Sequence, residues 1–139
     1  MIGGGMAGIL TAHALRQAGI SSVVLEAHTV GSGQTAGTTA KLTAQHGLCY
    51  SWLIDTYGPE IARQYAQANL RGIDWIRSLG ADCDLRDCTS YLYTTLAPDR
   101  LQNEWNAGRQ LGLDLFFTRE TELPFSAAAL GLRHQAVFH

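Results

Sequence analysis

The spacing of hydrophobic positions changes along the chain, and each change predicts an element. Small and apolar residues over 6–18 predict a first helix, which Gly19 ends in a left-handed conformation. The next run, 22–26, is apolar and rich in β-branched side chains, which is typical of a buried parallel strand. This order indicates a βαβ unit whose first strand is largely missing, because only Met1 and Ile2 precede the glycines that lead into the helix.

Beyond residue 46 the pattern alternates between helical and extended periods. Over 60–79 the apolar residues recur at steps of three and four and form one stripe of a long helix. Alternating positions near 91–95 are typical of a strand. The predicted elements are helices over 50–57, 60–79 and 98–111, a hairpin over 83–95 with its turn near 88–90, strands over 113–118 and 132–138, and a turn of helix from Thr121 to Pro124.

These elements predict an α/β chain with two regions. Residues 1–46 are expected to form a truncated Rossmann-like, dinucleotide-binding domain, and residues 47–139 part of an α+β domain with an antiparallel sheet. Within the first region, 29–45 interleaves glycines with serines and threonines. Such a segment is typical of a backbone that approaches a ligand closely, and its latter half is able to begin a helix.

The chemistry of the first region begins with a glycine loop. Gly3, Gly5 and Gly8 fit the pattern G-x-G-x-x-G, which lays a dinucleotide pyrophosphate on a helix N-terminus. In this pattern the first glycine allows the tight turn, the second the approach to the pyrophosphate, and the third the close packing of helix and strand. The predicted pyrophosphate-binding residues are Gly3, Gly4, Gly5, Met6, Ala7 and Gly8.

A carboxylate at the end of the next predicted strand makes the glycine pattern more specific. Glu26 follows Gly8 by 18 residues and is itself followed by Ala27, which we include in the candidate site. A carboxylate there accepts hydrogen bonds from ribose hydroxyls and repels a 2′-phosphate, which disfavours NADP. The glycines and Glu26 alone do not separate FAD from NAD.

A resemblance carried by the segment 30–47 favours FAD over NAD. Its stretch Thr-Thr-Ala-Lys-x-Thr-x-Gln-His-Gly over 38–47, together with 1–8 and Glu26, resembles FAD-dependent oxidoreductases of the D-amino-acid oxidase (DAO, glycine/sarcosine oxidase-like) family. More narrowly, it is similar to a bacterial branch whose members often carry a C-terminal Rieske iron–sulfur domain. The resemblance extends over essentially all 139 residues. It implies that the first region is a FAD-binding domain and the second part of a substrate domain.

The resemblance also implies roles for individual residues. Gly3, Gly5 and Gly8 would bind the FAD pyrophosphate, and Glu26 the adenosine ribose. Lys41 either lies near the flavin as a cation or faces solvent, and His46 either faces the flavin or packs structurally. The residues implied along the path from pyrophosphate to flavin are Gly33, Thr35, Thr38, Thr39, Ala40 and Lys41.

The implied function is the oxidation of a small-molecule amine or amino acid by hydride transfer to FAD. The sequence identifies neither the substrate, the electron acceptor nor the catalytic residues. We expect the chain to be an N-terminal fragment, inactive and marginally folded by itself, with a [2Fe-2S] Rieske cluster confined to a full-length parent. Two alternatives stay open, an NAD-linked dehydrogenase and a non-catalytic nucleotide-binding or interaction module.

Composition excludes several other classes. Ten basic and twelve acidic side chains leave a net charge of −2, which gives no electrostatic reason to expect nucleic acid. No apolar run is long enough to predict a membrane span, and the five histidines show no metal-ligand spacing. Three cysteines without C-x-x-C spacing are typical of reduced thiols in the cytoplasm, with a Cys83–Cys88 disulfide as the alternative.

Overall fold

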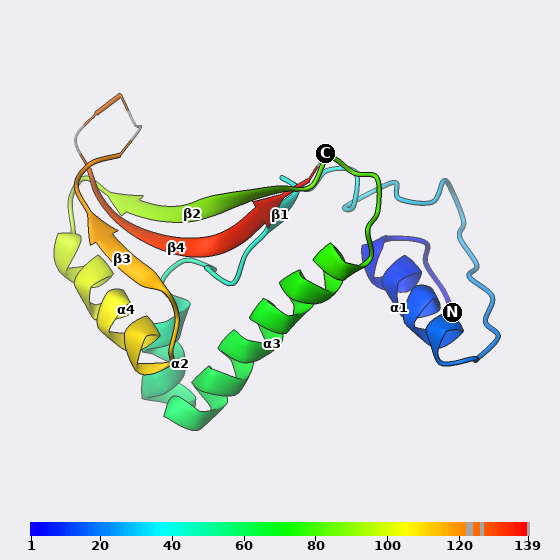
Figure 1. The fold of residues 1–139 in the computed structure, drawn as a ribbon, viewed down its shortest axis with the longest axis horizontal. Coiled ribbons are helices and arrows are strands. Elements are labelled where there is room, and N and C mark those ends of the chain that lie inside the picture. The colour runs from blue at the N-terminus through cyan, green and yellow to red at the C-terminus, as the bar shows by residue number, and fades with distance from the viewer. Residues whose placement is uncertain (122–123, 126, 139) are drawn as a thin grey trace. The chain divides into compact units, whose positions relative to one another are not determined.

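The chain forms two compact units, Met1–Thr39 and Ala40–His139, as judged from its internal contacts. They are seen in a computed structural model that describes residues 1–121, 124–125 and 127–138 (Figure 1). The predicted helical turn from Thr121 to Pro124 includes 122–123 and therefore lies outside the described residues.

The first unit contains helix α1, Met6–Gln17, which confirms the first predicted helix. The residues ahead of it pair in parallel with the segment after it, through a single bridge between Ile2 and Leu25. In this pairing the N–H of Leu25 donates to the carbonyl of Met1 at 2.9 Å, and the N–H of Gly3 to the carbonyl of Leu25 at 2.8 Å.

The expectation of a buried strand over 22–26 is wrong in this structure. Only one residue of the segment joins the bridge, and the side chains of Val23 and Leu25 are 69% and 61% exposed. The physical reason is the short partner, since the two residues before Gly3 supply few ladder hydrogen bonds and cover little of either face.

In the second unit three helices follow the predicted hydrophobic periods. They are α2, Cys49–Tyr57; α3, Pro59–Ser78; and α4, Pro98–Gln110. Gly58, with φ of 83°, separates α2 from α3 in a backbone conformation that side chains rarely adopt. A proline stands in the first turn of both α3 and α4, where its missing N–H costs no helical hydrogen bond.

The same unit contains a four-stranded antiparallel sheet, which confirms that part of the predicted fold class. The strands are β1, Lys41–Leu42; β2, Arg86–Thr94; β3, Leu115–Thr118; and β4, Ala128–Val137. β4 pairs with all three others, with β2 along one edge and with β1 and β3 along the other. Residues 41–42 therefore form a strand rather than the helix that the latter half of 29–45 allowed.

Two strand predictions are corrected in this sheet. The expected hairpin over 83–95 is one continuous strand, β2, whose register with β4 shifts between Cys88 and Ser90. The polar stretch there imitates a turn but continues the strand, and the extra residue of the β-bulge lies opposite it in β4, where His134 has φ of 59°. The last strand also begins at Ala128 rather than 132, because alanines are weak strand formers and hide its start.

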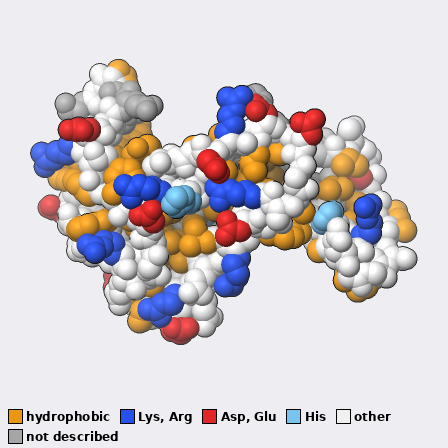
Figure 2. Space-filling model, viewed as in Figure 1, with side chains coloured by type: hydrophobic (Ala, Val, Ile, Leu, Met, Phe, Trp, Pro, Cys, Tyr) orange, Lys and Arg blue, Asp and Glu red, His pale blue; other side chains and the backbone are white. Residues whose placement is uncertain are grey.

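The core of the second unit lies where α2, α3 and α4 cover one face of this sheet (Figure 1). Leu130 and Leu132 of β4 are at most 1% exposed and form its centre. On the face seen in Figure 2, acidic and basic side chains are interspersed, with hydrophobic side chains between them. Further core residues are Leu42, Tyr50, Leu53, Ile73, Leu101, Leu111, Leu113 and Leu115.

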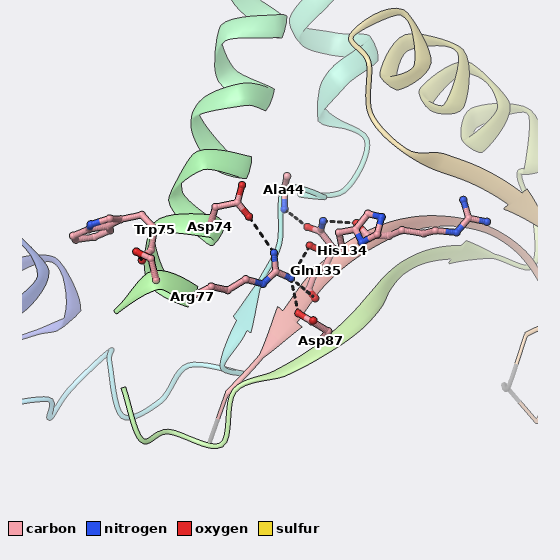
Figure 3. A network of polar contacts seen from close by, with 9 residues as sticks. Ala44, Asp74, Trp75, Arg77, Asp87, His134 and Gln135 are labelled. Atoms are coloured by element: carbon pink, nitrogen blue, oxygen red, sulfur yellow. Dashed lines mark hydrogen bonds and ion pairs between the residues drawn. The ribbon is translucent and has the colours of Figure 1, made fainter. Parts of the chain in front are cut away.

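Buried or half-buried polar side chains fix the ends of the helices in this unit. Glu104 of α4 is 1% exposed and accepts hydrogen bonds from the N–H groups of Tyr50 and Ser51, at 2.7 and 2.9 Å. Arg77, near the end of α3, pairs with Asp87 of β2 at 2.7 Å and donates to the carbonyl of His134 at 3.0 Å (Figure 3). The bulged region of β2 and β4 is thereby tied to α3.

Candidate functional site

The glycine loop leads directly into the N-terminus of α1. Gly5 is the N-cap residue, with φ of −75° and ψ of −178°, and as a glycine it has no side chain that could cap the helix. The first N–H groups of a helix have no acceptor within the helix and favour a negatively charged ligand. Here the N–H of Met6 donates to the hydroxyl oxygen of Thr35 at 3.0 Å. The first turn carries no acidic side chain that would compete with an anion.

The loop approaches the helix too closely for a side chain at position 8. A Cβ atom on Gly8 would lie 2.0 Å from the carbonyl oxygen of Gly3, a distance that real Cβ atoms do not reach. Gly3 itself has φ of 97°, which a side chain would strain. The tight turn and the close approach that G-x-G-x-x-G requires are both present in this loop.

Glu26 turns its carboxylate back to the same loop. Oε2 accepts a hydrogen bond from the N–H of Gly4 at 2.7 Å, and Oε1 accepts one from the N–H of His28 at 2.8 Å. The hydrogen bonds from these backbone N–H groups, that of Gly4 above all, hold the pKa of the Glu26 carboxyl below its ordinary value. A carboxylate has about four acceptor positions, so Glu26 keeps positions for further donors.

The glycine- and threonine-rich segment folds back onto the glycine loop in this unit. The N–H of Gly31 donates to the carbonyl of Gly4 at 2.9 Å, beside the contact of Thr35 with Met6. Within the segment, the N–H of Gly37 donates to the carbonyl of Gly33 at 3.2 Å. The N-terminal end of α1 is therefore bordered by backbone and hydroxyl groups from two segments of the chain.

The structure divides the predicted site residues between the two units. Gly4 contacts Glu26 and Met6 contacts Thr35, whereas Ala40 and Lys41 belong to the second unit. His46, also in the second unit, places Nε2 3.3 Å from the amide oxygen of Asn69. The residues of the first unit are Gly3, Gly4, Gly5, Met6, Ala7, Gly8, Glu26, Ala27, Gly33, Thr35, Thr38 and Thr39.

Sequence reasoning missed two backbone contributors to this arrangement. Gly31 bonds the glycine loop, and the N–H of His28 helps to hold Glu26. Gly31 lies in the segment that the glycine and threonine pattern marked, so that pattern contained its signal. The N–H of His28 has no such signal, because every residue except proline carries one.

Neither a metal-binding cluster nor a membrane-spanning helix is present among the described residues. Over 1–121, 124–125 and 127–138, His, Cys, Asp and Glu side chains form no group of three or more that would hold a metal ion. Among the helices in those ranges, none combines the length and apolar character needed to cross a membrane.

Comparison with known proteins assigns the chain, including its glycine loop, to a family. The family model of the FAD dependent oxidoreductases, DAO, matches residues 1–139. The chain belongs to the DAO family. FAD is therefore the cofactor of this kind of domain, as the resemblance of 1–8, Glu26 and 38–47 implied.

A curated relative supports the narrower resemblance within the DAO family. It is the "Putative Rieske 2Fe-2S iron-sulfur protein YhfW" of Bacillus subtilis (strain 168), 38% identical over 146 aligned positions. The alignment covers 100% of this DAO-family chain and 29% of the relative, so the chain spans less than a third of that protein's length. No solved structure matches the chain.

Proposed function

We propose that this DAO-family chain supplies the adenosine-diphosphate-binding part of an FAD-dependent oxidoreductase that oxidises an amine or amino acid. The observation that carries the proposal is the joint placement of the α1 N-terminus, Glu26 and Thr35 around one glycine loop. This arrangement supports a Rossmann-like binding mode, in which phosphate and ribose are held at neighbouring points of a βαβ unit.

The pyrophosphate is held by backbone groups in this proposal. The N–H groups of Gly5 and Ala7 lie at the start of α1, where free donors and the helix dipole favour anions, and the N–H of Met6 between them donates to Thr35. The Thr35 hydroxyl accepts from Met6 and keeps its own hydrogen to donate to a phosphate oxygen. The hydrogen bonding of the Thr35 hydroxyl would therefore change when the pyrophosphate binds.

The ribose is held by Glu26. Its two backbone hydrogen bonds fix the direction of the carboxylate and keep it ionised, and the remaining acceptor positions suit a pair of ribose hydroxyls. Ala27 follows Glu26 in the chain and belongs to the same candidate site. A phosphate on the 2′-hydroxyl would meet a second negative charge, which favours FAD over an NADP-type cofactor.

The further residues of the site rest on the family resemblance. We assign Gly33, Thr38, Thr39, Ala40 and Lys41 to the path from pyrophosphate to flavin. Bound FAD supplies the hydride acceptor, so the protein's share is to bind and orient the cofactor and the amine. The proposal also includes a cytoplasmic location. It further includes a Rieske cluster in a longer parent protein, of the kind that the name of the B. subtilis relative gives.

Competition between nucleotides tests this function. We expect the 139-residue chain to quench FAD fluorescence on binding, ADP to compete, and FMN, which lacks the adenosine half, to bind at least tenfold more weakly. Glu26→Gln should weaken FAD and ADP alike by about fivefold to tenfold, as expected for one lost charge-assisted hydrogen bond. Asp55→Asn, at an exposed position of α2, is the control and should change neither.

Two results would contradict the proposal. Equal affinity for FMN and FAD would mean that the adenosine diphosphate half is not recognised. NAD binding with no FAD binding would favour the dehydrogenase alternative instead.

A further inference from the structure

The second unit contains a groove whose lining shares only Lys41 with the FAD proposal. It lies between β1 and α3 and has a volume of about 450 Å³, within the size range of small-molecule sites. Its lining is mainly apolar and includes Leu42 of β1 and Ala68, Gly72, Ile73 and Ile76 of α3. Gly72 leaves the space beside it open, because a Cβ atom there would meet nothing within 4 Å.

The polar groups of the groove are few and mostly fixed in place. Asn69 donates to the carbonyl of Tyr65 at 2.9 Å, and its amide oxygen lies 3.3 Å from Nε2 of His46. The Tyr65 ring is held edge-on against the rings of His46 and Tyr50, with centroids 6.3 and 6.2 Å apart. The Thr43 hydroxyl accepts from the N–H of Gln45 at 2.9 Å, which leaves its own hydrogen to donate.

Lys41 sets the charge of the groove. It is the only lysine in the sequence and is exposed on β1. Among the residues that the structure describes, it forms neither an ion pair nor a side-chain hydrogen bond. No acidic side chain lines the groove, so its one charge is positive.

We propose that this groove binds a small organic anion with a flat apolar body. The carboxylate, or a similar anionic group, pairs with the Lys41 ammonium and accepts a hydrogen bond from the Thr43 hydroxyl. The apolar body lies over the part of α3 where the residues are small, at Ala68 and Gly72. A cationic ligand would be repelled by Lys41, and a neutral one would leave that ammonium without a partner. All residues that line the groove belong to the second unit.

The single lysine gives a direct measurement of binding. In protein labelled with ¹³C-lysine, the side-chain signals belong to residue 41 alone and report on the groove. The probes are 2-naphthoate and its neutral isostere 2-naphthamide. We expect naphthoate to shift the Lys41 signals in a saturable way and to bind about fivefold more tightly than the amide, the gain of one exposed ion pair.

Two substitutions separate charge from shape. Lys41→Gln, followed through the Tyr65 ring signals, should remove the preference for naphthoate, and Lys41→Arg should keep it. Gly72→Leu should fill the groove and abolish binding of both probes while the helix content is kept, since leucine favours helix over glycine. Gln67→Leu, on the same helix but outside the groove lining, is the matched control and should leave binding unchanged.

Three outcomes would overturn the proposal. They are equal affinity for naphthoate and naphthamide, full binding by the Gly72→Leu protein, and an unchanged Lys41 spectrum at saturating probe. Each is measured without FAD, and neither Glu26 nor the glycine loop enters the measurement, so a failure here is distinguishable from a failure of the FAD titration.

Discussion

At the start of α1, one carbonyl oxygen decides which side chain residue 8 can carry. The Gly3 oxygen lies where the Cβ atom of any other residue at position 8 would be, and Gly3 already has the positive φ that places this oxygen there. The two glycines therefore act as a pair. On α3, by contrast, Gly72 faces open space and has no such constraint.

We expect Gly8→Ala and Gly72→Ala to act in opposite directions. Alanine favours the helix in both places, by about 1 kcal/mol. At position 8 the clash forces the loop to move, at a cost of roughly 1–3 kcal/mol, and FAD affinity should fall by about tenfold or more. Urea denaturation and FAD titration of both proteins make the comparison. Unchanged FAD affinity after Gly8→Ala would show that the close approach is not needed.

At the scale of elements, α2 depends on a side chain from another helix for its N-terminus. Its N-cap residue, Leu48, provides no cap, and its first turn contains no acidic residue. Glu104 of α4 takes that place and also accepts from the Ser51 hydroxyl at 2.7 Å. The cap links two helices that are far apart in the sequence, so it contributes to tertiary packing as well as to α2.

Replacing Glu104 by glutamine should destabilise the protein by about 1–3 kcal/mol, because buried donors of α2 lose their charged acceptor. Glu60→Gln is the matched control. Glu60 pairs with Arg63 at 2.9 Å on the exposed side of α3, where the loss should be about 0–1 kcal/mol. The free energies of unfolding of the two variants are compared in urea. Equal losses would mean that Glu104 does not act as a cap.

The presence of a helix could be predicted from the sequence wherever one of its faces is apolar. The stripe of α3 and the prolines of α3 and α4 are local signals, and the observed bounds of both helices agree with them within a residue or so. The continuous course of β2 could not be predicted, because a polar triplet has the same composition in a turn and in a strand that faces a bulge in β4. The Glu104 cap was equally hidden, since nothing local links residue 104 to α2.

The same limit applies to the candidate site. The glycine spacing and Glu26 follow from the chemistry of one ligand and are visible in the sequence. The hydroxyl contact of Thr35 with Met6 joins positions 29 residues apart, and only the fold brings them together. The groove beside Lys41 depends in the same way on the pairing of β1 with β4.

At the scale of the whole molecule, the two units differ in how much structure holds them. β4 bonds to three strands and is buried along most of its length, and Gln135 within it accepts from the N–H of Ala44 at 2.7 Å. In the first unit, α1 has no buried residue, and the segment after it is joined by one bridge. Protection from local opening should follow this difference, because it depends on burial and on hydrogen bonds withdrawn from water.

Hydrogen exchange should therefore separate the units. We expect the amides of β4 to exchange slowest and those of residues 20–39 to exchange fast, with α1 between them. Added FAD should slow exchange in residues 3–8 and at Gly31, since binding stabilises only the state that binds. Mass spectrometry of peptides from protein with and without FAD gives both results, and FMN is the control ligand. Uniform exchange along the chain would contradict the difference between the units, and FAD protection confined to the second unit would move the cofactor away from the glycine loop.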